Sequence, residues 1–209
     1  MREVPLVSEP ELVVLLNDDG SPRGSAPKSE VHHRDTPLHL AFSCWVLDDE
    51  GRTLLTRRAP GKRTWPGIWT NTFCGHPAPG EDVTDAVRRR ARDELGCAVR
   101  DVEPILPDFR YRAVMDDGTV ENEVCPVFTA RFVSSPQPNP TEIDDFEWVS
   151  LQDLPRMIHE NARRLSPWMR WQFAQFGTMQ STGSRPADVG NDPTARSASG
   201  STADPARRS

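Results

Sequence analysis

The chain is poor in lysine, in tyrosine and in long apolar runs. Only two of its 25 basic residues are lysines, and it has a single tyrosine. No run approaches the roughly 18 apolar residues of a membrane span, so we expect no association with a membrane. The formal net charge of −6 lacks the basic excess of a non-specific nucleic-acid binder, so we expect no nucleic-acid partner either.

Cysteine is also scarce, and its spacing excludes a disulfide framework or a CxxC metal site. The four cysteines lie far apart in the sequence, and the N-terminus has no secretory signal pattern. Reduced thiols in a cytoplasmic protein are the natural expectation. The sequence leaves open whether the chain is a monomer or a homodimer.

The composition divides the chain into three parts. Residues 177–209 are mostly Ser, Gly, Ala, Asp, Pro and Arg, with almost nothing to bury, and we expect this tail to be disordered. Residues 12–176 suit one domain with a single core. Residues 1–11 are expected to be an N-terminal extension.

Apolar periodicity predicts an α+β fold, with helices on the faces of a mixed β-sheet sandwich. Residues 38–47 alternate as a strand, residues 52–58 return as its hairpin partner, and residues 119–133 form another long strand. Residues 22–27 are expected to be a loop. The central helix is predicted over residues 82–95, where Gly96 ends it, and two later helices are expected to start after Ser150 and at Pro167.

The stretch Thr70-Asn71-Thr72-Phe73-Cys74-Gly75-His76-Pro77 places a thiol two residues from an imidazole. We expect Gly75 to let the backbone turn sharply, so that Cys74 and His76 face one pocket. Nearby cations would then lower the pKa of Cys74 and suit it to catalysis. The alternative is that Cys74 is a small buried apolar residue, as most cysteines are.

Histidines and glutamates supply a candidate metal site. Glu121 and Glu123 lie two apart on a predicted strand, so both carboxylates project from one face. Imidazoles combined with carboxylates suit Mn²⁺, Zn²⁺ or Fe²⁺. The alternative is a set of surface residues, because the histidines do not form a compact motif. The candidate ligands are His32, His39, His76, Glu121 and Glu123.

Cationic and aromatic residues supply candidate substrate contacts. Lys28 and Lys62 lie in loops that flank the predicted pocket, and Arg90 lies four residues before Glu94 on the central helix. The arginines of that helix could pair with its acids or bind a phosphate. Tyr111 and Trp168 could be core residues. If the reaction passes through a carbocation, their aromatic rings could instead stabilise its positive charge.

Two sets of motifs carry a family resemblance. The span from Gly75 through Glu81 and Arg89 to Gly96 resembles a Nudix box, with Arg90 and Asp93 where the usual box has glutamates. The surrounding sequence closely resembles type 1 isopentenyl-diphosphate delta-isomerase over roughly residues 17–176. The matching motifs are Leu38-His39-Leu40-Ala41-Phe42-Ser43, Thr56-Arg57-Arg58, Trp65-Pro66-Gly67, residues 70–77, Tyr111-Arg112-Ala113, Glu121-Asn122-Glu123-Val124-Cys125-Pro126 and Ser166-Pro167-Trp168-Met169.

The resemblance implies a Nudix fold and the interconversion of isopentenyl and dimethylallyl diphosphate in isoprenoid synthesis. It implies that Cys74 and Glu123 form the acid–base pair, with Trp168 facing a tertiary cation. We favour Glu123 with Tyr111 as the donor of the first proton, but the sequence leaves open which member of the pair donates it. The implied metals are Mg²⁺, held by Glu94 and the Cys74 carbonyl oxygen, and a second ion, favoured as Mn²⁺ with Zn²⁺ as the alternative. The implied ligands of that second ion are His32, His39, His76, Glu121 and Glu123. The implied diphosphate contacts are Lys28, Arg58, Lys62 and Arg90.

Two other functions fit parts of the pattern. A Nudix pyrophosphohydrolase would need the box acids that Arg90 and Asp93 replace. A non-catalytic binding module would have little use for a thiol and a carboxylate placed as an acid–base pair. The sequence therefore favours an isomerase with a small diphosphate substrate.

Overall fold

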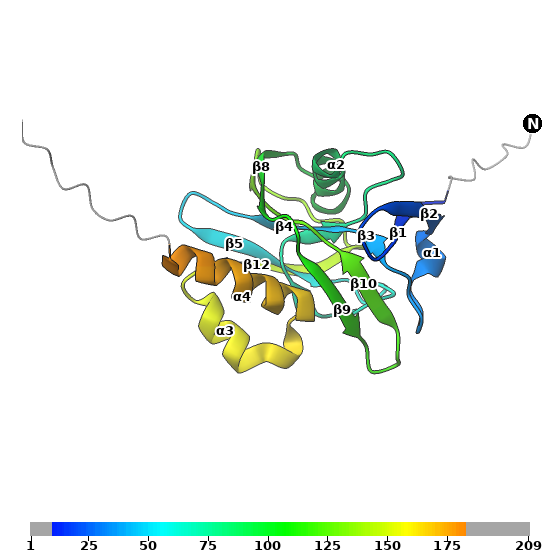
Figure 1. The fold of residues 1–209 in the computed structure, drawn as a ribbon. Helices are drawn as coiled ribbons and strands as arrows, with labels where there is room; N and C mark the ends of the chain where they lie inside the picture. The colour runs from blue at the N-terminus through cyan, green and yellow to red at the C-terminus, as the bar shows by residue number, and fades with distance from the viewer. Residues whose placement is uncertain (1–9, 183–209) are drawn as a thin grey trace, which may run out of the picture.

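The computed structural model describes residues 10–182 and shows an α+β fold with three β-sheets and helices on either side (Figure 1). The first sheet has the order β2-β1-β3-β10-β9, the second β7-β4-β11-β8, and the third β12-β5-β6. The strands are β1 (Leu12–Leu16), β2 (Pro22–Pro27), β3 (His39–Leu40), β4 (Phe42–Val46), β5 (Arg52–Arg58), β6 (Trp69–Thr70), β7 (Phe73–Gly75), β8 (Val99–Leu106), β9 (Arg110–Val114), β10 (Val120–Val124), β11 (Val127–Phe132) and β12 (Ile143–Ser150).

Two predicted long strands are each divided in the structure, and they divide at the same level. The predicted strand over residues 38–47 becomes β3 and β4, and the one over residues 119–133 becomes β10 and β11. β3 runs parallel to β10 in the first sheet, and β4 runs parallel to β11 in the second. Pro126 has no backbone N–H to continue the ladder, which is one reason for the break. The two chain segments therefore cross from one sheet to the other side by side.

The predicted loop over residues 22–27 was wrong, because this segment forms the edge strand β2. It pairs antiparallel with β1, from Leu12 opposite Pro27 to Leu16 opposite Pro22, with an irregularity between Leu15 and Leu16. Its two prolines stand at the ends of the strand, where edge strands tolerate them. The polar composition of an edge strand makes it resemble a loop in sequence.

Helix α2 (Val83–Leu95) lies on one side of the sheets (Figure 1). The side chain of Asp82 accepts hydrogen bonds from the backbone N–H groups of Thr84 and Asp85, which caps the helix N-terminus. Gly96 ends the helix in the left-handed conformation, with φ of 62°, as the sequence predicted. Ala86, Val87, Ala91 and Leu95 are buried against β4, β7 and β8.

Helices α3 (Leu154–Asn161) and α4 (Pro167–Thr182) lie on the opposite side from α2, and the short α1 (Lys28–Val31) lies beside β1 and β2 (Figure 1). Pro167 begins α4 as predicted. The predicted cap at Ser150 was wrong, because α3 begins three residues after Leu151, with Asp153 at the N-cap position. Ser150 instead ends β12, and its hydroxyl accepts from the N–H of Gln152 at 3.2 Å.

The predicted domain limits can be compared only with the elements nearest to them. α4 continues to Thr182, so the helical part of the chain extends past the expected boundary at Gly177. The rest of the predicted tail, and residues 1–9 of the predicted extension, lie outside the described residues. Glu11 belongs functionally with the domain, because its carboxylate pairs with Lys28 at 2.9 Å.

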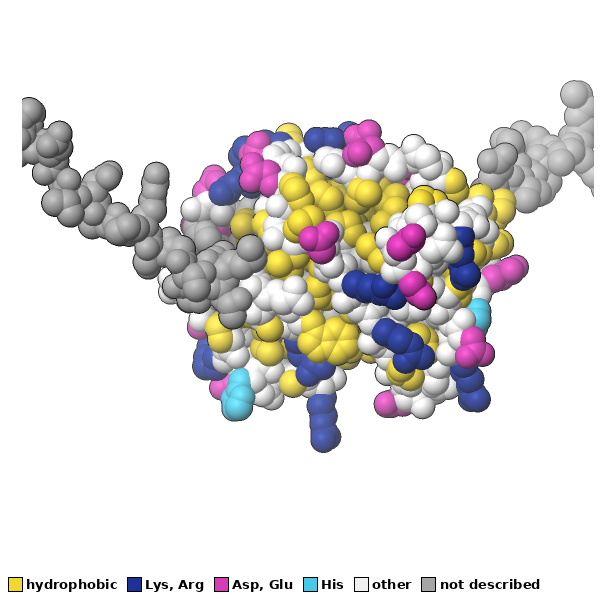
Figure 2. All heavy atoms as spheres, in the orientation of Figure 1, with side chains coloured by type: hydrophobic (Ala, Val, Ile, Leu, Met, Phe, Trp, Pro, Cys, Tyr) yellow, Lys and Arg dark blue, Asp and Glu magenta, His cyan; other side chains and the backbone are white. Residues whose placement is uncertain are grey.

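The surface of the described residues carries charges of both signs. On the face shown in Figure 2, acidic and basic side chains are interspersed rather than separated into broad patches. No helix of the described chain is long and apolar enough to cross a membrane.

Candidate active site

One cavity gathers most of the predicted site residues. It has a volume of about 420 Å³ and lies where β10, β7, α1, α2 and α4 approach one another. All the predicted site residues line it except His39 and Glu94. The predicted residues that do so are Lys28, His32, Arg58, Lys62, Cys74, His76, Arg90, Tyr111, Glu121, Glu123 and Trp168.

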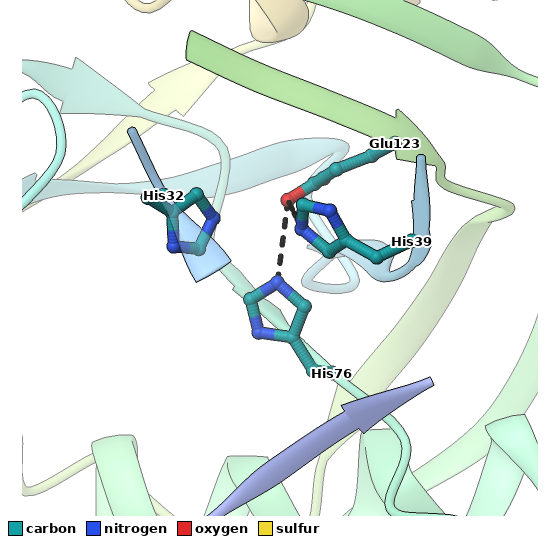
Figure 3. A group of neighbouring side chains, drawn as sticks. All are labelled: His32, His39, His76 and Glu123. Atoms are coloured by element: carbon teal, nitrogen blue, oxygen red, sulfur yellow. Dashed lines mark hydrogen bonds and ion pairs between the residues drawn. The ribbon is translucent and has the colours of Figure 1, made fainter. Parts of the chain in front are cut away.

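Three histidines and one glutamate converge beside this cavity (Figure 3). One ligand atom from each of His32, His39, His76 and Glu123 lies within 4.8 Å of the other three. His32 follows α1, His39 is in β3, His76 follows β7, and Glu123 is in β10. The parallel register that places Glu123 opposite His39 brings two of these groups together directly.

The unpartnered nitrogens of this cluster fit a bound metal ion. His39 Nδ1 lies 2.9 Å from the carbonyl oxygen of Pro37, which can only accept a hydrogen bond, so Nδ1 carries the hydrogen and Nε2 keeps its lone pair. His39 Nε2, His32 Nε2 and His76 Nδ1 are buried without a hydrogen-bond partner. Buried polar atoms are rarely left without a partner, and three imidazoles with a carboxylate suit a divalent transition metal.

The protonation states of the cluster also suit metal binding. Burial lowers the pKa of His32 and of His76 to about 4, so both imidazoles are neutral near pH 7. Burial alone would raise the pKa of Glu123, but the adjacent imidazoles of His39 and His76, at 3.4 and 3.3 Å from its Oε1, hold it well below the usual value. The site thus presents neutral imidazoles at His32 and His76 beside an ionised carboxylate, which are the forms that bind metal, whereas burial lowers the pKa of His39 less than its neighbours, Glu123 foremost, raise it.

Glu121 is close to this cluster but is not one of the four converging groups. Its Oε2 accepts a hydrogen bond from the phenolic hydroxyl of Tyr111 at 2.5 Å. Burial and the neighbouring charge of Glu123 raise the pKa of Glu121. The expected pairing of Tyr111 with the Glu123 side of the site is thus made through Glu121, although Tyr111 and Glu123 are opposite each other in the β9–β10 pair. The tyrosine side chain reaches the diagonal neighbour instead.

The expectation about the Cys74 thiol was wrong in one respect. Burial raises the pKa of Cys74 to about 12, although the hydroxyl of Ser43 acts in the opposite direction. At neutral pH the sulfur is therefore a thiol rather than a thiolate. Arg58 lowers this pKa less than burial raises it, so cations beside the cavity do not activate the sulfur in the way the sequence suggested.

Gly75 has a different role from the predicted turn. It lies in β7, so Cys74 and His76 face the same side of the chain because they are two residues apart on an extended segment. A Cβ atom at Gly75 would lie 2.8 Å from Cγ of Arg90 and 2.9 Å from Cζ of Phe42. The glycine therefore allows the strand to approach α2 closely.

Five Lys and Arg side chains border the cavity, the four predicted ones and Arg63, which donates to the carbonyl oxygen of Ser29; each already has a protein partner. Lys28 pairs with Glu11, and Lys62 pairs with Glu142. The guanidinium of Arg58 donates to the carbonyl oxygen of Thr64 at 3.0 and 2.9 Å. Sequence reasoning missed Glu11 and Glu142, since nothing near them in the sequence connects them to the two lysines.

Arg90 and Glu94 pair along α2, as their spacing suggested. The guanidinium of Arg90 donates to Oε1 of Glu94, and it lies 3.5 Å from Glu142. Burial acts against the charge of Arg90, but these two carboxylates raise its pKa. Glu94 does not line the cavity in this state, because its carboxylate is turned to Arg90.

Trp168 forms an aromatic wall of the cavity with its neighbours. Its ring centroid lies 5.3 Å from that of Trp65 and 5.8 Å from that of Tyr111. The guanidinium of Arg58 is 5.8 Å from the indole centroid. Trp168 is 2% exposed, so this electron-rich face is shielded from bulk water, which strengthens its attraction for positive charge.

Comparison with known proteins agrees with this geometry. Residues 37–171 match the NUDIX domain. An isopentenyl-diphosphate Delta-isomerase from Mycolicibacterium vanbaalenii is 59% identical over 165 residues, which are 79% of this chain and 91% of the relative. One from Paenarthrobacter aurescens is 54% identical over 166 residues, covering 79% and 90%.

A solved structure agrees on the fold. A crystal structure from Deinococcus radiodurans superimposes with a TM-score of 0.56 at 20% identity, covering 72% of this chain and 90% of that one. The predicted Nudix fold is confirmed. The chain therefore belongs to the isopentenyl-diphosphate Delta-isomerase family, within the larger group of proteins that contain a NUDIX domain.

Proposed function

We propose that this protein interconverts isopentenyl and dimethylallyl diphosphate by moving a proton on and off a five-carbon skeleton. The observation that carries the proposal is the shared cavity: Cys74, three of the four members of the histidine–glutamate cluster, Trp168 and the cationic border all line it. A hydrolase has no need of a buried thiol, and a binding module has no need of two proton-carrying groups.

The cationic border would hold the diphosphate. Lys28, Arg58, Lys62 and Arg90 line the cavity, and guanidinium groups suit phosphate oxygens in shape and charge. The diphosphate must stay attached to the five-carbon skeleton. The cationic side chains would therefore neutralise its charge without activating a water molecule. Mg²⁺ on Glu94 and the Cys74 carbonyl oxygen would complete this end of the site, once Glu94 leaves Arg90.

Cys74 and Glu123 would carry the acid–base chemistry. Burial raises the pKa of Cys74 to about 12, which favours the neutral thiol, and the imidazoles beside Glu123 lower its pKa, which favours the ionised carboxylate. A thiol can give a proton and a carboxylate can take one, so we assign Cys74 as donor and Glu123 as acceptor for a turnover that starts from this state. This reverses the order expected from the sequence, and Tyr111 would support the carboxylate side through Glu121.

The remaining residues would protect the cation formed between the two proton transfers. Trp168 would face the tertiary carbon that carries the positive charge. Its burial would keep water from adding to the cation. A divalent ion on His32, His39, His76 and Glu123, favoured as Mn²⁺ over Zn²⁺, would supply positive charge that fixes the Glu123 carboxylate and biases its proton affinity.

Isotope labelling tests the function directly. The protein, loaded with Mg²⁺ and Mn²⁺, is incubated with isopentenyl diphosphate in deuterated water, and the allylic product is analysed for deuterium. Labelled dimethylallyl diphosphate is the expected result, because the new C–H bond takes its hydrogen from an exchangeable group. Release of phosphate from a nucleotide panel, with no labelled allylic product, would instead indicate a hydrolase.

A further inference from the structure

The Cys74 sulfur lies between two buried polar side chains that no part of the proposed chemistry has used so far. Ser43 Oγ is 3.2 Å from Cys74 Sγ, and the two residues are opposite each other in the antiparallel β4–β7 pair. On the other side, Cys74 Sγ lies 3.4 Å from Oδ1 of Asn71. Ser43 and Asn71 are both fully buried.

The direction of the Ser43 hydrogen bond is set from helix α4. Trp45 Nε1 lies 3.0 Å from Oε1 of Gln172, and an indole N–H can only donate. This contact fixes the orientation of the Gln172 amide, so its NH₂ group faces Ser43 Oγ at 2.8 Å and donates to it. Since the serine oxygen accepts from Gln172, its own hydrogen is available to a sulfur.

The direction at Asn71 is set in the same way. Its Nδ2 lies 3.0 Å from the carbonyl oxygens of Cys44 and Phe73, which can only accept. The amide oxygen therefore faces the other way, where it accepts from the hydroxyl of Thr70 at 3.0 Å. It is also the acceptor for the hydrogen of the Cys74 thiol.

We propose that Ser43 and Asn71 are positioning residues for the Cys74 thiol, and that Gln172 holds Ser43 in its donor orientation. Ser43 offers a hydrogen to the sulfur, and Asn71 offers an oxygen to the sulfur's own hydrogen. The thiol is thereby held in one orientation, and neither partner needs to turn when the sulfur loses or regains its proton. Pre-organised groups of this kind cost no reorganisation during the reaction. The catalytic consequence rests on the proposed isomerase function.

A second sulfur competes for the serine hydrogen. Cys125 Sγ lies 3.4 Å from Ser43 Oγ, and a hydroxyl has one hydrogen to give. Cys125→Ala removes that sulfur, so the Ser43 hydroxyl should then donate its hydrogen to Cys74 alone. The structural alternative is that Ser43, Gln172 and Trp45 only satisfy one another's buried polar atoms, in which case their loss would affect folding and not the thiol.

The test combines vibrational spectroscopy with kinetics on Ser43→Ala. The S–H stretching band of Cys74 is isolated by subtracting the infrared spectrum of the same protein carrying Cys74→Ala. We expect this band to move to higher frequency in Ser43→Ala, because the S–H···O contact to Asn71 loses the polarising hydrogen bond at sulfur. We also expect kcat to fall at least tenfold while KM for isopentenyl diphosphate stays within twofold.

Matched variants separate positioning from stability. Thr53→Val removes another fully buried hydroxyl, which donates to Val46 O at 3.1 Å away from the cavity, and should leave the band and kcat unchanged. Gln172→Met should also raise the frequency of the S–H band and lower kcat, both by less than Ser43→Ala. If Ser43→Ala does not fold, the Gln172→Met result decides whether the thiol is positioned by Ser43. An unmoved band with wild-type kcat in the folded variant overturns the proposal. Because the band needs no turnover, a failure of the isomerase function would be seen separately, as a wild-type protein without activity.

Discussion

Tyr111 donates its phenolic hydrogen to Glu121, at 2.5 Å, and not to Glu123, the residue directly opposite it in the β9–β10 pair. The two glutamates therefore have different surroundings despite being two residues apart. Glu123 faces three imidazoles and stays ionised, whereas burial and its charged neighbour raise the pKa of Glu121. A pair of carboxylates that looks symmetrical in sequence is divided into a group that faces the imidazoles and a group that is bound to tyrosine.

Cys74→Ala should abolish isomerisation and leave diphosphate binding largely intact. The substitution removes the proton-carrying sulfur but none of the cationic groups. Turnover and calorimetric binding of isopentenyl diphosphate should be measured together, with Cys97→Ala, a cysteine outside the cavity, as the matched control. Appreciable residual turnover in Cys74→Ala would contradict the role of the thiol.

Glu123→Gln should weaken metal retention and stop turnover. The neutral amide keeps the shape of the side chain but removes the only negative charge among the four converging groups. Elemental analysis after dialysis should show less Mn²⁺ than in wild type, alongside an activity assay. Glu103→Gln, at an exposed position in β8, should change neither quantity. A metal-replete and active Glu123→Gln protein would be incompatible with our assignment.

Arg90→Met should raise KM for isopentenyl diphosphate about tenfold or more, with a smaller effect on kcat. One lost charge-assisted contact of about 1.5–3 kcal/mol predicts a change of this size. Inhibition by inorganic pyrophosphate should weaken in parallel, since it binds through the same groups. Arg88→Met alters the neighbouring exposed arginine, which pairs with Asp85, and should leave KM unchanged. Equal KM values for the two variants would remove Arg90 from the diphosphate site.

The metal-free protein should lose stability as the pH falls from about 6.5 towards 4. Burial lowers the pKa of His32 and His76 to about 4, so over this range the unfolded chain takes up protons that the folded chain does not. The free energy of unfolding should therefore decrease by about 1 kcal/mol per imidazole and pH unit. Urea unfolding of chelated protein at pH 7 and pH 5 measures this. His76→Gln should reduce the slope, whereas His159→Gln, at an exposed position, should not.

Gly75→Ala should destabilise the fold by about 1–3 kcal/mol through overpacking. The added methyl would lie 2.8 Å from Cγ of Arg90 and 2.9 Å from Cζ of Phe42, and one of the two must move. Gly61→Ala is the control, because a Cβ there has no neighbour within 4 Å. Urea unfolding of both variants gives the comparison, and equal midpoints would show that β7 can withdraw from α2 without cost.

The sequence predicted the family, the fold class and most of the residues around the cavity, because these depend on local motifs with fixed spacing. It did not predict which glutamate Tyr111 reaches, because that depends on the diagonal geometry of a strand pair. It also gave the wrong direction for the pKa of Cys74, because burial depends on what packs over the sulfur from distant segments. The edge strand β2 was missed because its pairing partner, and not its composition, makes it a strand.

The break between β3 and β4 has a consequence for how this site can vary. A single extended segment delivers His39 to the imidazole cluster and, four residues later, Ser43 to the sulfur. The segment alongside is arranged in the same way: Glu123 lies opposite His39, and Cys125, two residues later, lies beside Ser43. The covalent chain thus fixes the distance between the imidazole cluster and the Cys74 thiol. An insertion or deletion at Ala41, between β3 and β4, would therefore displace the imidazole cluster relative to the thiol.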